Sequence, residues 1–339
     1  MDRAASGLSG AAAGAQLERE LAGLHDALAR LRSSIAKAHI GDERVVEELL
    51  LGLLAGGHVL LEGVPGLGKT TLVRALAASL DLSFRRVQFT PDLMPGDILG
   101  MRVLEQDEQG QRRFVFQPGP VFANVVLADE INRATPRTQS ALLEAMQERQ
   151  VTLYGEVHPL DDPFFLIATQ NPIEMEGTYP LPEAQLDRFL LEIQMTAPGL
   201  EELEAILRAT AMRPERQIEP VLGLREVRRL RELARSVPIG SEIVHAVALL
   251  VQATHPGNPK APEAVRRHVR YGVSPRGGQA VLWTAQARAL VQGRAHVSME
   301  DVEAACVPAL RHRLILSYEG EASGARTDDL VRQALSAAR

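Results

Sequence analysis

This chain has little cysteine and few aromatic residues, and neither sign of charge dominates it. Its 339 residues include one cysteine and 4% aromatic side chains, and the formal net charge is −6. The single cysteine, Cys306, can form no disulfide within the chain and has no second thiol for a thiolate metal site, so we expect a reducing, cytoplasmic location. The modest negative charge and the scarcity of aromatic rings argue against a nucleic acid as the main partner.

Long apolar runs are also missing. No stretch approaches the ~18 uninterrupted apolar residues of a membrane-spanning helix, so we expect no stable membrane insertion. Residues 1–16 are rich in Ala, Gly and Ser and lack the leucine block of a signal peptide, which predicts a disordered leader. With 45% apolar and 24% charged residues, the chain has an ordinary globular composition and enough length for two domains.

A seam of leucines follows the leader. Its apolar positions are Leu17, Leu21, Leu24, Leu28, Leu31 and Ile35. They step by four and three, which predicts an amphipathic helix. This helix could pair with a partner as a coiled coil, or it could pack against its own domain. We favour packing within the chain because the seam extends over only about three heptads.

A glycine-rich loop lies between a predicted strand and a predicted helix. Val59–Leu61 form a short apolar run, Leu72–Leu80 have helical character, and residues 63–70 between them match G-x-x-x-x-G-K-[ST]. Such a loop binds phosphate because its glycines let backbone N–H groups approach the oxygens, and the helix N-terminus adds partial positive charge. The loop and the residue after it are Gly63, Val64, Pro65, Gly66, Leu67, Gly68, Lys69, Thr70 and Thr71.

The loop predicts a role for two of its side chains. Lys69 would contact the β- and γ-phosphates of ATP, and the Thr70 hydroxyl would bind Mg²⁺. The alternative is a glycine turn followed by an ordinary surface lysine. The strand before the loop and the helix after it favour the phosphate-binding interpretation.

Two acidic residues follow a fully apolar run, Val125–Ala128, which predicts a central parallel strand. They are Asp129 and Glu130, at the end of the strand where ligands bind in open α/β sheets. Asp129 would hold Mg²⁺, directly or through water, and Glu130 would polarise the attacking water. In isolation the pair could simply cap a helix, but the phosphate-binding loop earlier in the chain favours the hydrolytic role.

Three further polar residues are candidates for the site, each with a plain structural alternative. Asn171 follows the apolar strand Phe164–Ala168 and could hold the attacking water, or it could belong to an Asn-Pro turn. Arg188 could stabilise the phosphoryl group transferred in a neighbouring subunit or form a surface ion pair, and its spacing alone does not decide. Arg276 lies at the start of a predicted helix and could reach the γ-phosphate, or it could be a residue of that helix with no contact to phosphate.

The predicted elements divide the chain near residue 198. Before it, strands and helices alternate, and after it only helical periodicity is strong. We predict an α/β domain over 17–198, with a parallel five-stranded sheet between helices and β-hairpin inserts near 101–116 and 151–158. A smaller all-helical lid domain and a C-terminal tail would occupy 199–339.

Six motifs together resemble the MoxR family of AAA+ ATPases. They are GVPGLGKT at 63–70, LADEINRA at 127–134, QSALLEAM at 139–146, ATQNP at 168–172, LPEAQLDRF at 181–189 and SPRG at 274–277. The resemblance runs from about Gly41 to about Leu316, and the motifs occur in the order expected for the family.

The resemblance implies a role for each candidate residue. Asn171 would be sensor 1, Arg188 an arginine finger and Arg276 sensor 2, with ATP and Mg²⁺ as the cofactors and with Ile40 and Gly41 also at the nucleotide. The two hairpins would be a helix-2 insert and a pre-sensor-1 insert, as in magnesium-chelatase ATPase subunits and McrB-type motors.

The resemblance also implies an assembly and a partner. Family members form hexameric rings and act as chaperones that remodel or activate protein partners, often partners with von Willebrand factor A domains, sometimes during metal or cofactor insertion. In such a ring, Phe114 or Tyr154 on the hairpins could contact the partner, whereas we expect Phe116 to anchor its hairpin on the core.

Two other functions remain as alternatives. One is a nucleic-acid motor of related fold, which the arginine clusters at 225–235 and 266–270 could support, although the first cluster interleaves with glutamates as a solvated helix face does. The other is a nucleotide-gated scaffold with little turnover. The presence of Glu130, Asn171 and Arg188 argues against the scaffold.

Overall fold

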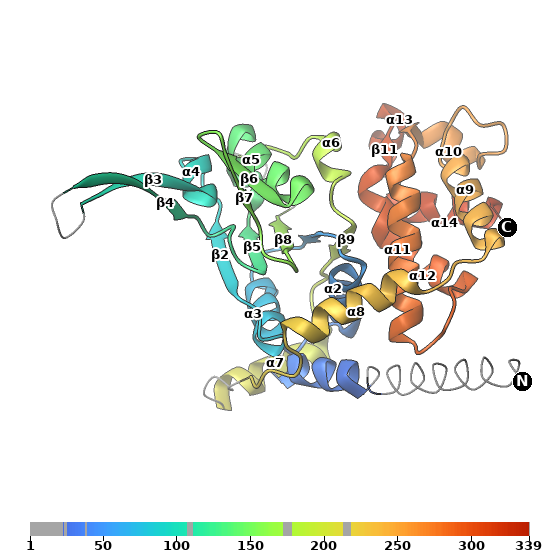
Figure 1. The fold of residues 1–339 in the computed structure, drawn as a ribbon. Coiled ribbons are helices and arrows are strands. Elements are labelled where there is room, and N and C mark those ends of the chain that lie inside the picture. The colour runs from blue at the N-terminus through green and yellow to red at the C-terminus, as the bar shows by residue number, and fades with distance from the viewer. Residues whose placement is uncertain are drawn as a thin grey trace, which may run out of the picture.

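A five-stranded parallel sheet forms the centre of the protein (Figure 1). The computed structural model describes residue 23 and residues 26–37, 39–106, 111–171, 178–212 and 218–338, with the backbone alone over 209–212. The strands of the sheet are β1 (Val59–Glu62), β2 (Phe84–Gln88), β5 (Val125–Asp129), β8 (Phe165–Gln170) and β9 (Leu191–Gln194). Their order across the sheet is β2-β5-β8-β1-β9, and every neighbouring pair is parallel. The predicted α/β fold class is confirmed.

Helices cover both faces of this sheet. Side chains alternate along a strand, so Leu61 and Leu127 enter one apolar cluster while Leu60 and Ala128 enter another. The first cluster includes α2 (Glu43–Ala55) and α3 (Lys69–Ser79), and the second includes α4 (Pro95–Leu99) and α5 (Pro136–Glu148). Burial on both faces explains why the central strands are almost entirely apolar.

The described part of the leucine seam packs within the chain. Residues 26–37 are helical, and Leu28, Leu31 and Ile35 are buried in the same cluster as α2. Packing within the chain is therefore confirmed for this part of the seam. Leu17, Leu21 and Leu24, together with the predicted leader 1–16, lie outside the described residues.

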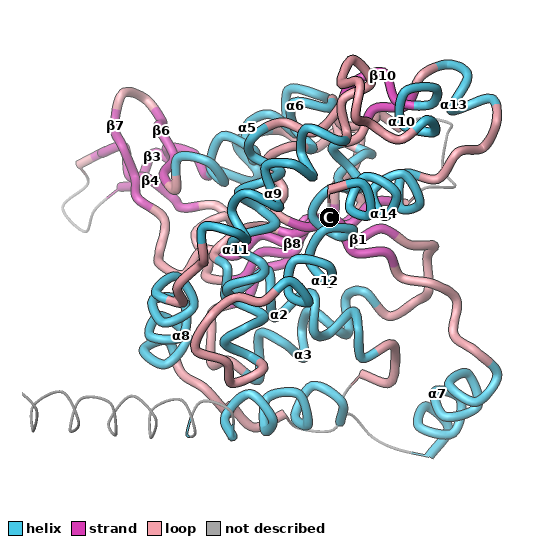
Figure 2. Tube along the Cα trace, turned by 90° about the vertical axis from the view of Figure 1, so that its right-hand side faces the viewer, coloured by secondary structure: helices cyan, strands magenta, loops and turns pink. Residues whose placement is uncertain are grey.

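The region after β9 is a helical lid. Its helices are α7 (Leu200–Met212), α8 (Leu224–Ser236), α9 (Ser241–Ala253), α10 (Glu263–His268), α11 (Pro275–Val291), α12 (Met299–Leu310), α13 (Tyr318–Ala322) and α14 (Thr327–Ala337), with a 3-10 turn, η2 (Arg311–Arg313), before α13. Figures 1 and 2 show α9 to α14 gathered on one side of the sheet, with α7 set apart at the edge of the molecule. One apolar cluster runs from the sheet into the lid, so the boundary near 198 stays a prediction.

The lid is not entirely helical, which corrects the sequence-based expectation. Two short strands, β10 (Val269–Tyr271) and β11 (Ile315–Leu316), pair in antiparallel fashion. Segments of three and two residues are too short to show an alternating pattern, and their pairing joins parts of the chain that are far apart in sequence.

Two hairpins project beside one another from the α/β region (Figures 1 and 2). They are β3 (Gly100–Gln106) with β4 (Arg112–Pro118), and β6 (Gln150–Leu153) with β7 (Glu156–Pro159). Arg102 NH2 lies 2.6 Å from Glu156 Oε1, and the rings of Phe116 and His158 stack at 4.1 Å. Phe116 also contacts Phe122, which packs against the second apolar cluster, so Phe116 anchors its hairpin on the core as predicted. Phe114 and Tyr154 are 70% and 64% exposed. The turn residues 107–110 lie outside the described part of the chain.

Over the described ranges, no single helix combines the length and the apolar character needed to cross a bilayer. In the same ranges, α8 and α9 taken together, with a bend of 88° between them, satisfy these criteria of length and composition.

A buried histidine precedes the first strand of the sheet. His58 Nδ1 accepts a hydrogen bond from the Leu166 backbone N–H at 3.0 Å, and Nε2 donates to the Met146 carbonyl at 3.2 Å. Both bonds together require the neutral ring with its proton on Nε2. Burial lowers the pKa of His58 to about 3, so the folded protein resists its protonation.

We expect this histidine to make the protein less stable in mild acid. The pKa of His58 in the unfolded chain is about 6.5, so between about pH 6.5 and pH 3 the unfolded state binds the proton more readily. Stability is therefore lost as the pH falls, by about 2 kcal/mol at about pH 5 from His58 alone. The free energy of unfolding by urea, measured at neutral pH and at about pH 5, gives this loss. In His58→Gln, which can form both hydrogen bonds without titrating, the pH profile should be flatter; parallel profiles would contradict the assignment.

Candidate active site

The phosphate-binding loop leads directly into the first turn of α3. Gly66 and Gly68 have φ values of 87° and 78°, in the left-handed region that favours glycine. Gly68 is the N-cap of α3, and within the described residues no side chain caps this end. The partial positive charge at such a helix N-terminus favours an anion, as at other phosphate-binding helix N-termini.

Lys69 is buried and folds back across this loop. Its Nζ donates a hydrogen bond to the Gly63 carbonyl at 2.6 Å. Gly63 is in turn held by the sheet, because its N–H donates to the Gln170 carbonyl at 3.3 Å. The lysine ammonium thus lies over the loop where the phosphates of a nucleotide would be bound.

A cavity of about 710 Å³ opens beside the loop. Apolar side chains from three segments line it, among them Ile40, Val45, Leu67, Met195, Leu203 and Ile206. Gly41 also lines it, so the structure brings Ile40 and Gly41 to the phosphate-binding loop. The volume and the mainly apolar lining suit a small ligand such as a nucleotide base and ribose.

His39 gives this cavity a polar group. Its side chain is buried and borders the cavity, and Nε2 has no hydrogen-bond partner among the described residues. Burial also lowers the pKa of His39, which favours the neutral ring. A buried, unpartnered nitrogen in a mainly apolar cavity fits the polar edge of a nucleotide, and ATP therefore suits the residues present.

Oxygen atoms from α3 and β5 converge on the other side of the loop. Thr70 Oγ1 lies 3.3 Å from Asp129 Oδ2, and Thr169 Oγ1 donates to Asp129 Oδ1 at 2.7 Å. Hydroxyl and carboxylate oxygens are the ligands that Mg²⁺ prefers, so this donor set suits the ion. Arg86 also contacts Asp129 Oδ2, through Nε at 2.9 Å and NH2 at 2.7 Å. Direct coordination of Mg²⁺ by that oxygen would have to compete with this arginine.

Glu130 is held beside Asp129 in an unusual backbone conformation. Its φ is 58°, which is uncommon for a residue with a side chain, and its N–H donates to Thr169 Oγ1 at 2.8 Å. Its carboxylate accepts hydrogen bonds from Gln88 Nε2 at 2.8 Å and from Arg133 NH1 at 3.0 Å. These contacts fix the carboxylate at the carboxyl end of β5, where non-glycine residues with positive φ are often functional.

Asn171 directly follows β8 and is buried. Strand β8 lies between β5 and β1, so Asn171 falls between the acidic pair and the phosphate-binding loop in the order of the sheet. The Asn171 carbonyl lies 3.4 Å from Asn132 Nδ2, which fixes the backbone at this point. The placement is compatible with the predicted contact to water. Pro172 lies outside the described residues.

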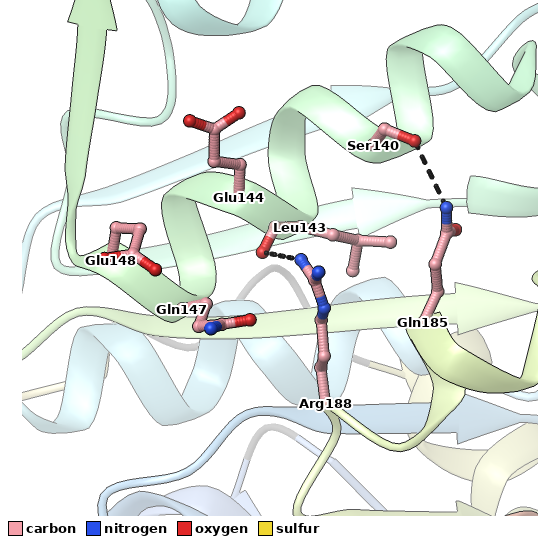
Figure 3. A pocket seen from close by; sticks show the side chains of 7 residues that line it. All are labelled: Ser140, Leu143, Glu144, Gln147, Glu148, Gln185 and Arg188. Atoms are coloured by element: carbon pink, nitrogen blue, oxygen red, sulfur yellow. Dashed lines mark hydrogen bonds between the residues drawn. The ribbon is translucent and has the colours of Figure 1, made fainter.

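Arg188 lies apart from this group. It follows α6 (Glu183–Leu186), and its NH1 donates to the Leu143 carbonyl of α5 at 3.0 Å (Figure 3). A cavity of about 350 Å³ surrounds it, lined also by Ser140, Glu144, Gln147, Glu148 and Gln185. Arg188 Nε is buried and has no hydrogen-bond partner in the described part of the chain. Among the described residues, no member of the phosphate-binding loop lines this cavity.

Arg276 shares a second cavity with Arg188. This cavity has a volume of about 300 Å³ and is lined by both arginines and by Asp187 and Trp283. Arg276 NH1 lies 3.8 Å from Asp187 Oδ2, and its side chain is 56% exposed. The sequence suggested that Arg276 could reach the γ-phosphate, but it does not line the cavity beside the loop of its own subunit. Its predicted role stays a prediction.

Four polar residues at the site were missed by the sequence analysis. They are His39, Arg86, Gln88 and Thr169. Arg86 and Gln88 alternate along β2 and pair in register with Leu127 and Asp129 of β5. Alternating polar residues at the carboxyl end of a strand would have been the signal, but only the adjacency of β2 and β5 shows which acids they meet.

Comparisons with known proteins agree with this arrangement. Residues 58–191 match the ATPase family associated with various cellular activities (AAA), and residues 262–334 match the AAA lid domain. "Chaperone MoxR1" of Mycobacterium tuberculosis is 42% identical over 91% of this chain and 81% of its own length. "Protein MoxR" of Methylorubrum extorquens is 33% identical over 91% and 93%.

Two further relatives extend over nearly the whole chain. "Uncharacterized protein YeaC" of Bacillus subtilis is 42% identical over 93% of this chain and 95% of its own length. A crystal structure of a Cytophaga hutchinsonii protein has 38% identity and a TM-score of 0.88, over 95% of this chain and 97% of that one. This chain therefore belongs to the MoxR family of AAA+ ATPases.

Proposed function

We propose that this chain hydrolyses ATP with Mg²⁺ in a homo-oligomeric, hexameric ring and uses the turnover to remodel or activate a protein partner. One observation carries the proposal: the predicted catalytic groups form two separate sets. The phosphate-binding loop, Asp129, Glu130 and Asn171 lie at the carboxyl ends of the central strands. Arg188 and Arg276 share a cavity that is different from the one beside the loop. Because neither arginine lines the cavity beside the loop, each is available to a nucleotide held by a neighbouring subunit.

Each residue of the first set would act on bound ATP in its own subunit. The loop N–H groups and Lys69 would hold the phosphates, and Thr70 and Asp129 would hold Mg²⁺, which neutralises negative charge on the phosphate oxygens when bound. Asn171 would orient the attacking water. Glu130 would accept its proton through a carboxylate whose Oε2 is already bound by Gln88 and Arg133.

Arg188 and Arg276 would complete the site from the next subunit. Positive charge beside the transferring phosphoryl group stabilises the charge that develops on its oxygens. Arg188 is suited to this because its guanidinium has a buried nitrogen without a partner among the described residues. Hydrolysis would then depend on assembly, since an isolated subunit holds only one part of the site.

The partner is proposed to be a protein, with a von Willebrand factor A domain or a site for metal or cofactor insertion. The relative named as a chaperone supports a protein partner. Phe114 and Tyr154, exposed on the two linked hairpins, offer apolar contacts for it. The nucleic-acid motor is less well supported, because Arg228 and Arg231 are engaged with Asp162 rather than free for phosphates.

Phosphate release by the assembled protein tests the proposal. We expect turnover of ATP that requires Mg²⁺, stops on chelation of the metal and does not respond to double-stranded DNA. Stimulation by DNA that falls steeply with salt would favour the nucleic-acid motor. Rings that bind ATP but release no phosphate, with or without a partner protein, would favour the scaffold.

A further inference from the structure

Asp187 lies immediately before Arg188 in the chain and faces the lid. Its Oδ1 accepts a hydrogen bond from Arg313 Nε at 2.8 Å, and its two oxygens lie 3.3 and 3.2 Å from the hydroxyl of Ser274. Ser274 is the N-cap of α11, the helix that begins with Pro275 and carries Arg276. One carboxylate therefore joins the segment of Arg188 to the start of the helix that carries Arg276.

The backbone around Arg188 is also fixed to the lid. Arg313 has 3% of its side chain exposed, and its NH2 donates to the carbonyls of Asp187 at 3.0 Å and Phe189 at 2.5 Å. Its NH1 donates to the Leu190 carbonyl at 3.2 Å, and His312 Nε2 donates to the Phe189 carbonyl at 3.1 Å. The 3-10 turn η2 thus holds the whole segment 187–190 against the lid.

The charges in this region leave two guanidinium groups available. The Asp187 carboxylate neutralises Arg313, which is buried and would be costly to leave unpaired. Arg276 lies farther from the same carboxylate, at 3.8 Å, and is largely exposed. Arg188 donates to the Leu143 carbonyl, which carries no formal charge. The cavity that Arg188 and Arg276 share therefore carries surplus positive charge and suits an anion.

We propose that Asp187 is a positioning residue that makes Arg188 and Arg276 a single unit. It would fix segment 187–190, which carries Arg188, to α11, which carries Arg276. Both arginines would then contact the phosphates of a neighbouring subunit's ATP together. This inference rests on the proposed function, since it requires both arginines to act on a nucleotide bound by another subunit. Asp187 does not line the cavity beside the phosphate-binding loop, so ATP binding by the same subunit should not depend on it.

The substitution Asp187→Asn tests this role. It keeps the size of the side chain and a hydrogen-bond acceptor for Ser274, but it removes the charge that holds Arg313. We expect kcat to fall by at least about tenfold, while KM and the affinity for ATP change by less than about twofold. Asp162→Asn is the matched control, because Asp162 also joins the α/β region to a lid arginine, Arg231, at 3.0 Å but contacts neither Arg188 nor Arg276. The kcat of Asp162→Asn should stay within about twofold of the wild type.

Mixed rings separate positioning from a general loss of structure. Asp187→Asn subunits mixed with Glu130→Gln subunits should recover turnover, because some interfaces then pair an intact Glu130 with an intact Asp187 and Arg188. The same subunits mixed with Arg188→Ala should not recover, because both substitutions affect the same side of the interface. Wild-type kcat in Asp187→Asn, or recovery in the mixture with Arg188→Ala, would overturn the inference.

A parallel mixture keeps this inference distinguishable from the proposed function. Arg188→Ala with Glu130→Gln involves no change at Asp187. If turnover recovers in this mixture but not in the mixture of Asp187→Asn with Glu130→Gln, the positioning role of Asp187 is overturned and the proposed function is unchanged. If Asp187→Asn does not assemble, Ser274→Ala replaces it, since it removes only the hydroxyl bound to the same carboxylate. It should lower kcat by about threefold and recover with Glu130→Gln; unchanged kcat would again overturn the inference.

Discussion

Replacing Arg188 by alanine should remove most ATP hydrolysis and leave ATP binding intact. An arginine that stabilises charge on the transferring phosphoryl group contributes on the order of 10³–10⁵ in rate, so we expect kcat to fall by at least about 10³-fold. Binding should persist because Arg188 does not line the cavity beside the phosphate-binding loop. Phosphate release and equilibrium binding of a fluorescent nucleotide measure the two effects on the same preparation.

The control for this substitution is an exposed arginine of the lid. Arg332 lies on α14 and pairs with Asp329 at 3.0 Å, within one turn of the same helix. Arg332→Ala should leave both kcat and the affinity for ATP unchanged, since an exposed pair of this kind contributes little. If Arg188→Ala keeps the wild-type kcat in assembled rings, Arg188 does not act in hydrolysis. The alternative from the sequence, a structural arginine at the surface, would then hold.

Replacing Glu130 by glutamine should likewise separate binding from hydrolysis, through the other side of the interface. The amide keeps the size of the side chain but cannot accept a proton from water, and loss of a general base lowers rates by about 10²–10⁴-fold. Lys69, Thr70 and the loop are unchanged, so ATP should bind and remain intact. Chromatography of the bound nucleotide after incubation shows whether it is ATP or ADP.

A glutamate far from the site provides the comparison for Glu130→Gln. Glu242 is exposed in the first turn of α9, and Glu242→Gln should hydrolyse ATP at the wild-type rate. If wild type and Glu130→Gln hydrolyse ATP equally slowly, the carboxylate is not a catalytic base and the scaffold function gains support. Bound ADP in Glu130→Gln at the wild-type level would have the same meaning.

The sheet and most of the site were predictable because their signals are local. The apolar runs at β1, β5 and β8 reflect burial on both faces, and the loop, Asp129, Glu130 and Asn171 all follow such runs directly. In a parallel sheet these carboxyl ends meet at one edge. A local pattern therefore fixed which of these residues would come together.

The position of Arg276 was not predictable, because long-range contacts determine it. The lid is held to the α/β region by Asp187 and Arg313, which are 126 residues apart in the chain. Neither residue has a local pattern that shows its partner, and a basic residue near a helix start is compatible with many arrangements. The pairing of Arg86 with Asp129 was missed for a similar reason, since it depends on the adjacency of β2 and β5.

Mixed rings test most directly the central claim that each active site is completed by the neighbouring subunit. Arg188→Ala and Glu130→Gln subunits are combined in equal amounts, and phosphate release is measured on rings shown by native mass spectrometry to contain both. With random assembly, roughly a quarter of the interfaces pair an intact Glu130 with an intact neighbouring Arg188. We predict turnover far above that of either variant alone. Mixed rings that form but remain as inactive as the separate variants would contradict the claim.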